Sequence, residues 1–89
     1  MKTVSIIVSG KVQGVFYRQS TKELATALDI NGQVKNLPDD TVEIIATGEE
    51  GQIEKLVKWC RLGPPKAEVE SVVVREIPFR SYGKFTIER

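Results

Sequence analysis

The sequence predicts an α+β domain in which two helices pack on one face of an antiparallel sheet. Apolar residues alternate with polar ones in some stretches, as in half-buried strands, and recur at three- and four-residue spacing in others, as in amphipathic helices. Turn residues separate these stretches, which follow in the order β-α-β-β-α-β with a short final strand. That order is typical of the ferredoxin-like α/β sandwich. Because 89 residues have room for one core, we expect a single domain over residues 1–89.

The first half of the chain contains a strand, a helix and a hairpin. Alternation predicts a strand over residues 3–9, and helical spacing predicts a helix over residues 18–29. Two further strands, 30–36 and 41–47, flank the turn sequence Leu37-Pro38-Asp39-Asp40 and therefore form a hairpin. The predicted inward-facing residues are Val4, Ile6, Val8, Thr21, Leu24, Ala25, Leu28, Ile30, Gly32, Val34, Val42, Ile44 and Ala46.

The second half contains a helix and two strands. The helix spans residues 49–62, with acidic residues in its first turn, where the helix dipole favours them, and Gly63-Pro64-Pro65 ends it. A long strand over residues 67–77 shifts its apolar phase between Val69 and Val72, which predicts a bulge or bend. A short strand over residues 84–88 follows. The predicted inward-facing residues here are Ile53, Leu56, Val57, Cys60, Phe85 and Ile87.

Composition excludes several functions. Thirteen Lys and Arg balance twelve Asp and Glu, so the sequence lacks the basic excess of a nucleic-acid-binding protein. No apolar run approaches the ~20 residues that cross a bilayer, and the first residues lack the apolar region of a secretory signal, so we expect a cytoplasmic chain with no membrane contact. The absence of histidine excludes Ser-His and Cys-His catalysis and histidine metal sites. The lone Cys60 lies in a helical stripe and is predicted to be a core residue.

The segment from Gly10 to Arg18 joins the first strand to the first helix and carries the chemistry we consider. Gly10 and Gly14 permit backbone conformations in which successive N–H groups converge on an anion. The start of the helix adds its positive dipole end, and Arg18 can add a bidentate guanidinium. The pattern is neither a Walker loop nor a dinucleotide loop. These residues alone are also compatible with a plain strand-to-helix connection that is followed by a surface arginine.

The same residues resemble a family signature. Gly10-Lys11-Val12-Gln13-Gly14-Val15-Phe16-Tyr17-Arg18 is similar to the G-x-V-Q-G-V-x-[FY]-R motif of the acylphosphatase family, and it follows a strand, as it does there. Further similar blocks are Gly32-Gln33-Val34-Lys35-Asn36, Thr41-Val42-Glu43 and Gly63-Pro64-Pro65. The resemblance covers the whole chain.

The resemblance implies metal-free, cofactor-free hydrolysis of a small acyl phosphate to a carboxylate and inorganic phosphate. Arg18 would bind the phosphoryl group, and Asn36 would hold the attacking water. The loop amides that would share the phosphoryl group belong to Gln13, Gly14, Val15, Phe16 and Tyr17. Inorganic phosphate or sulfate would compete for the same loop. We expect a monomer that binds no nucleic acid.

Three positions depart from the family pattern: Ser9 is often histidine there, Gln33 is often aromatic, and Asp40 replaces a turn glycine. Asp40 requires either a strained turn or a left-handed backbone, which aspartate tolerates better than most residues. The side chains of Phe16, Tyr17 and Trp59 are predicted to serve packing, because a small domain needs aromatic area.

Two alternative functions stay open. The same fold serves small-anion sensors and RNA-binding modules, and RNA binding would require aromatic residues on the sheet face, where this sequence offers mostly Thr, Ser, Glu and Lys. The second alternative is an acylphosphatase-like domain of a larger carbamoyl-transfer machine, although a chain of 89 residues is expected to be free-standing.

Overall fold

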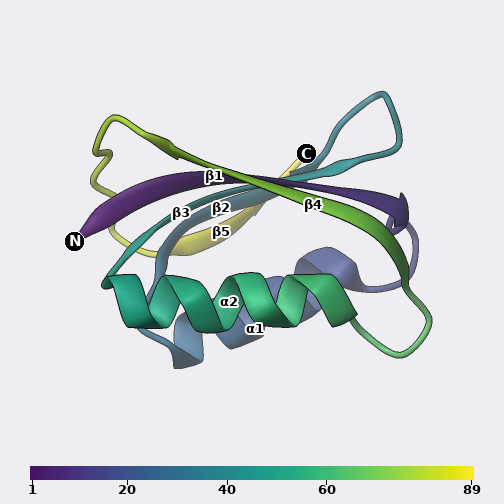
Figure 1. The fold of residues 1–89 in the computed structure, drawn as a ribbon, viewed down its shortest axis with the longest axis horizontal. Coiled ribbons are helices and arrows are strands. Elements are labelled where there is room, and N and C mark those ends of the chain that lie inside the picture. Colours follow the sequence, from purple (N-terminus) through teal and green to yellow (C-terminus); the bar gives the residue numbers. More distant parts are fainter.

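The computed structural model describes residues 1–89 and places both helices on one face of a five-stranded sheet (Figure 1). The elements are β1 (Lys2–Lys11), α1 (Tyr17–Ala27), β2 (Asn31–Asn36), β3 (Val42–Gly48), α2 (Glu50–Leu62), β4 (Glu68–Ile77) and β5 (Phe85–Glu88). The predicted elements are all present, with bounds that differ by at most two residues. The ferredoxin-like fold class is confirmed.

The sheet differs from the prediction at one edge. The strand order is β4-β1-β3-β2-β5, and β5 runs parallel to β2, whereas the other neighbouring pairs are antiparallel. The reason lies in the connection after β4. Residues 78–84 cross the sheet without leaving the end at which β4 finishes, so β5 must start at that end and run in the direction of β2. The sheet is therefore mixed.

Polar side chains hold this connection against the face of the sheet that the helices leave open. Thr3 Oγ1 accepts a hydrogen bond from the Arg80 N–H at 2.9 Å, and Thr47 Oγ1 donates one to the Arg80 carbonyl at 2.7 Å. Asn31 Nδ2 donates to the Tyr82 carbonyl at 2.9 Å. The threonines are buried as a result, and both backbone groups of residue 80 are satisfied.

The core lies between the sheet and the two helices, where the predicted inward residues are found. Val4, Ile6 and Val8 of β1 alternate inward and are fully buried. The members of the main cluster are Val4, Ile6, Val8, Val12, Val15, Tyr17, Ala25, Ile30, Val34, Val42, Ile44, Ala46, Ile53, Leu56, Cys60 and Phe85. The prediction that Cys60 is a core residue is confirmed.

The predicted irregularity of β4 is a bulge opposite the end of β1. Ser9 pairs with Ser71 and Gly10 with Val69, so Glu70 is the extra residue. Gly10 has a φ of +117°, and a Cβ there would collide with the backbone carbonyl of Glu68. Glycine is therefore required where β1 turns out of the sheet towards the following loop.

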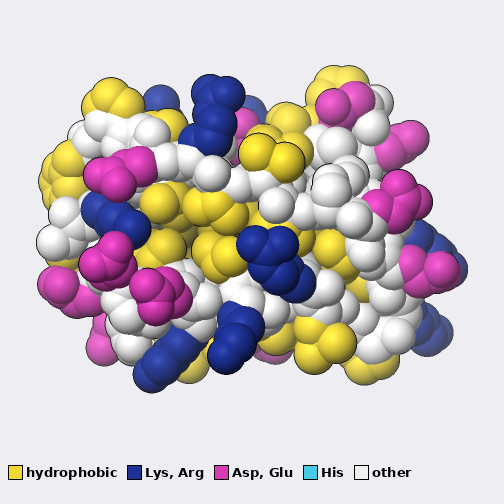
Figure 2. Space-filling model, in the orientation of Figure 1, with side chains coloured by type: hydrophobic (Ala, Val, Ile, Leu, Met, Phe, Trp, Pro, Cys, Tyr) yellow, Lys and Arg dark blue, Asp and Glu magenta, His cyan; other side chains and the backbone are white.

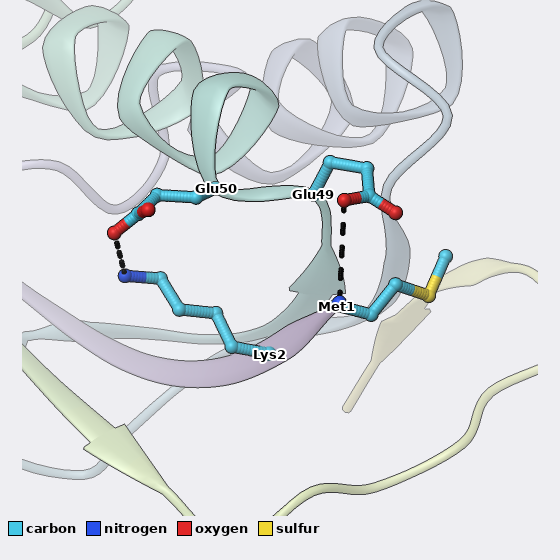
Figure 3. A network of polar contacts seen from close by, with 4 residues as sticks. All are labelled: Met1, Lys2, Glu49 and Glu50. Atoms are coloured by element: carbon cyan, nitrogen blue, oxygen red, sulfur yellow. Dashed lines mark hydrogen bonds and ion pairs between the residues drawn. The ribbon is translucent and has the colours of Figure 1, made fainter.

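The start of the chain is tied to the start of α2 (Figure 3). Lys2 Nζ lies 3.2 Å from Glu50 Oε1, and the terminal ammonium of Met1 lies 4.0 Å from Glu49 Oε2. Both acidic residues sit where the positive end of the helix dipole favours them, as the sequence predicted. The exposed glutamates limit each ion pair to about 1 kcal/mol or less.

The surface carries both signs of charge. On the face drawn in Figure 2, most Asp and Glu side chains lie towards the left and right ends, Lys and Arg side chains are spread between them and along the margins, and apolar side chains occupy the middle. Neither helix is long and apolar enough to cross a bilayer.

Candidate active site

Four parts of the chain meet at one end of the sheet. Val8 of β1 pairs with Val42 at the start of β3, and Asn36 at the end of β2 pairs with the same Val42. The loop after β1, the β2–β3 turn, the start of α1 and the end of β5 therefore lie together. They enclose a pocket of about 360 Å³, lined by Val12, Gly14, Phe16, Tyr17, Arg18, Gln19, Asn36, Ile87 and Arg89.

The loop presents a row of free backbone donors. None of the N–H groups of residues 13–19 donates a hydrogen bond within the chain. The backbone turns sharply here, since Gly14 has a φ of 74° and Phe16 has a φ of 65°. The first turn of α1 contains no acidic residue to complement the dipole, and Arg18 lies in it instead. This arrangement disfavours a free helix end but suits a bound anion.

Tyr17 anchors the loop to the core. Its hydroxyl donates to the Cys60 carbonyl at 2.8 Å, and its ring lies 5.3 Å from that of Trp59 between the centroids. Burial raises the pKa of Tyr17 above its ordinary value, so the hydroxyl stays a donor. Burial also raises the pKa of the Cys60 thiol to about 12, so this cysteine stays protonated and is no nucleophile at neutral pH.

Arg18 follows Tyr17 and lines the pocket. Its Nη1 lies 3.5 Å from the Glu88 carbonyl, the only hydrogen-bond acceptor that the guanidinium meets within the chain. The remaining N–H groups of the fork are therefore free for a ligand. Because β5 runs parallel to β2, both strands finish at the end of the sheet where the pocket lies, and the Glu88 carbonyl is found there.

Gln13 links the loop to the β2–β3 turn. Its side-chain Nε2 donates to the Leu37 carbonyl at 2.9 Å and to the Thr41 carbonyl at 2.8 Å. This side-chain amide therefore binds the β2–β3 turn. Only the backbone N–H of Gln13 is left for an anion.

The turn itself has the aspartate geometry expected from the sequence. Asp40 adopts a φ of 71°, the left-handed conformation that replaces the turn glycine. Asp39 Oδ1 accepts hydrogen bonds from the Thr41 hydroxyl and from the Thr41 N–H. Both bonds lower the pKa of Asp39, and the bond from the hydroxyl contributes more. The turn is thus held by its own side chains as well as by Gln13.

We expect Gln13→Ala to loosen the loop against the turn. Loss of two neutral hydrogen bonds should lower the free energy of unfolding by about 1–2 kcal/mol, and misplacement of the loop should lower kcat by roughly 10- to 100-fold. Urea unfolding and steady-state kinetics measure the two effects. Gln52→Ala is the matched control, because Gln52 also donates to a backbone carbonyl, that of Leu28, away from the pocket. Equal kinetics in the two variants would contradict a positioning role.

Asn36 contributes an unpaired acceptor. Its side-chain Oδ1 is buried and has no hydrogen-bond partner, although the residue lines the pocket. A buried carbonyl oxygen without a partner is unfavourable by about 1–3 kcal/mol, and few occur in native proteins. Asn36 therefore lines the pocket and has an acceptor that no group of the chain satisfies.

The structure brings together five of the residues singled out in the sequence: Gly14, Phe16, Tyr17, Arg18 and Asn36 line the pocket. Val15 turns its side chain into the core, and with Gln13 it stands outside the lining. The packing prediction is confirmed for Tyr17 and Trp59 and is wrong for Phe16, whose side chain is 77% exposed. Phe16 precedes the first residue of α1 and has a left-handed backbone, which turns its side chain away from the core.

Other lining residues were missed by sequence reasoning. The sequence did contain a signal for Gln19, because this residue follows Arg18 in the first turn of the predicted helix. Ile87 and Arg89 had none, because only the parallel direction of β5 carries them to this end of the sheet.

Fold and pocket together define a class: an α+β domain with a pocket where the first strand meets the first helix. The acylphosphatase family model matches residues 4–87. An acylphosphatase of Rubrobacter xylanophilus is 53% identical over 77 residues, which cover 86% of this chain and 70% of that one. The acylphosphatase structure from Bacillus subtilis has a TM-score of 0.97 and 33% identity, with all of both chains covered. The HypF structure from T. kodakarensis has a TM-score of 0.84 and 36% identity, and the match covers all of this chain but 12% of HypF.

This chain belongs to the acylphosphatase family. The predicted resemblance is therefore confirmed, as is the prediction of an enzyme of this family.

Proposed function

We propose that the chain hydrolyses acyl phosphates with Arg18 and the loop amides on the phosphoryl group and a water held by Asn36. The observation that carries this proposal is that Asn36, which lines the same pocket as Arg18, has a buried side-chain oxygen without a partner. An anion sensor needs the arginine and the amides alone. A hydrolase also needs a group that orients water, and the unsatisfied amide oxygen of Asn36 is the candidate for that role.

The phosphoryl group would be held by positive and dipolar groups. The free N–H groups of residues 13–19 and the fork of Arg18 can neutralise three phosphoryl oxygens, and they do not have to reorganise as charge shifts in the transition state. Positioning and charge stabilisation are the main contributions to phosphoryl transfer.

Asn36 would align the water opposite the leaving oxygen. An amide has no useful pKa near neutrality, so its contribution is orientation by a hydrogen bond to Oδ1, not general base catalysis. The water oxygen bonds to phosphorus, and the bond from phosphorus to the acyl oxygen breaks with its electron pair on the carboxylate. The proton of the water passes to an oxygen of the phosphate product. A carboxylate leaves readily, so no group has to protonate it.

We expect the purified chain to hydrolyse benzoyl phosphate at the same rate with and without EDTA. The charged and amide side chains of the pocket are those of arginine, asparagine and glutamine, a set that attracts an anion and includes no carboxylate side chain for a divalent cation. Phosphate and sulfate should inhibit competitively. A rate that disappears with chelator and returns with magnesium would contradict the metal-free mechanism.

The structure bears on the rival functions. The strands contain one aromatic residue, Phe85, and it is buried, so the open face of the sheet lacks the stacking platform of an RNA-binding module. Phosphate binding without turnover of benzoyl phosphate would favour the sensor. Because HypF contains this fold within a longer chain, the assay is done on this chain alone, and turnover there would support a free-standing enzyme.

We also propose that the enzyme is a cytoplasmic monomer that needs no second subunit. One chain supplies Arg18, Asn36 and the loop, the groups that the proposed mechanism uses, and the single thiol is buried. Light scattering measures the oligomeric state, and a dimer at assay concentration would contradict the proposal.

A further inference from the structure

Phe16 is a large apolar side chain without a structural role. Its ring is 77% exposed, although it lines the pocket. Its φ of 65° is unfavourable for a residue with a Cβ. Neither burial nor backbone preference accounts for a phenylalanine at this position, so its ring is available for a ligand.

The direction of the reaction indicates what that ligand is. In phosphoryl transfer the attacking and leaving oxygens lie roughly in line on opposite sides of phosphorus. Asn36 Oδ1 is buried, so a water that binds it would lie deep in the site. The leaving acyl group would then extend towards solvent, and Phe16 is the large apolar side chain of the lining that is exposed there.

We propose that the Phe16 ring contacts the acyl group and makes the enzyme favour acyl phosphates whose acyl group is aromatic or large and apolar. This inference rests on the proposed function, because it takes the position of the water from Asn36. The backbone that carries the Phe16 ring is anchored, because the next residue, Tyr17, is buried and its hydroxyl donates to the Cys60 carbonyl. Aromatic and aliphatic groups gain from contact with an aromatic face, whereas a methyl group has little area to cover it.

The experiment compares benzoyl phosphate with acetyl phosphate in wild type and Phe16→Ala. The measured quantity is kcat/KM for benzoyl phosphate divided by kcat/KM for acetyl phosphate. The two substrates differ in intrinsic reactivity, but this difference is the same for every variant and cancels when the ratios are compared. We expect the ratio to fall about 5- to 10-fold in Phe16→Ala. Phe16→Tyr keeps the aromatic ring and should restore the ratio.

Phosphate inhibition separates substrate contact from loop support. Alanine keeps the same backbone requirement at φ 65°, so the inhibition constant of inorganic phosphate should be unchanged in Phe16→Ala. Phe79→Ala is the matched control, because Phe79 is 60% exposed in the connection at the other end of the sheet, and its ratio should equal that of wild type.

An unchanged ratio in Phe16→Ala, or an equal loss for both substrates together with weaker phosphate inhibition, would overturn the inference. If wild type turned over neither substrate, the proposed function itself would fail, and the inference with it.

Discussion

We expect Arg18→Gln to lose at least about 10³-fold in kcat/KM, because one charge-assisted contact to the transition state is worth several kcal/mol. The same change should also weaken phosphate inhibition, since the guanidinium touches the phosphoryl group in the ground state and in the transition state. Stability should change by less than about 0.5 kcal/mol. The structure supports this, because the guanidinium makes one long contact to the Glu88 carbonyl and no ion pair.

Steady-state kinetics, phosphate competition and thermal unfolding test this result. Arg61→Gln is the matched control, because Arg61 is an exposed helix arginine in α2, away from the pocket, and it should keep wild-type kinetics. Arg18→Lys retains the charge but loses the fork, so it should recover only part of the rate. A folded Arg18→Gln variant with near-wild-type turnover would return Arg18 to the surface-arginine interpretation.

Asn36→Ala should separate chemistry from binding. An interaction made chiefly in the transition state affects kcat and leaves ground-state affinity unchanged. We therefore expect kcat to fall by about 100-fold, while the inhibition constant of phosphate stays within about twofold of wild type. The variant should be at least as stable as wild type, because the substitution removes a buried acceptor that has no partner.

Asn31→Ala provides the matched control for Asn36→Ala. Asn31 lies on the same strand, β2, but its amide donates to the Tyr82 carbonyl at the other end of the sheet. It should lose stability and keep kcat, the reverse of Asn36→Ala. Loss of phosphate affinity in Asn36→Ala as severe as in Arg18→Gln would make Asn36 a substrate ligand or a loop support. Full kcat would reduce it to the residue that begins the turn.

The sequence predicted the bulge of β4 as well as the order of elements. A phase shift between Val69 and Val72 is a local signal, because one extra residue reverses the faces on which the following side chains lie. The direction of β5 was not predictable in the same way. It depends on where residues 78–84 cross, and that depends on hydrogen bonds to Thr3, Thr47 and Asn31 from distant strands.

Phe16 shows a second limit of sequence reasoning. Aromatic residues in a small domain are usually buried, and this rule held for its neighbour Tyr17. A left-handed backbone at Phe16 turns the two side chains apart, one into the core and one outward. No pattern of residue types predicts that conformation, since phenylalanine disfavours it.

By itself, then, the sequence determined the elements, their buried faces, the loop from Gly10 to Arg18 and the family. Only the tertiary structure decided that the side chain of Gln13 binds the turn, that Asn36 has a buried, unpaired side-chain oxygen, and that the end of β5 lines the pocket. The physical reason is the range of the interactions. Periodicity, glycine conformation and turn chemistry act between residues a few positions apart, whereas the pocket depends on strand register and crossover direction, which bring together residues from both ends of the chain.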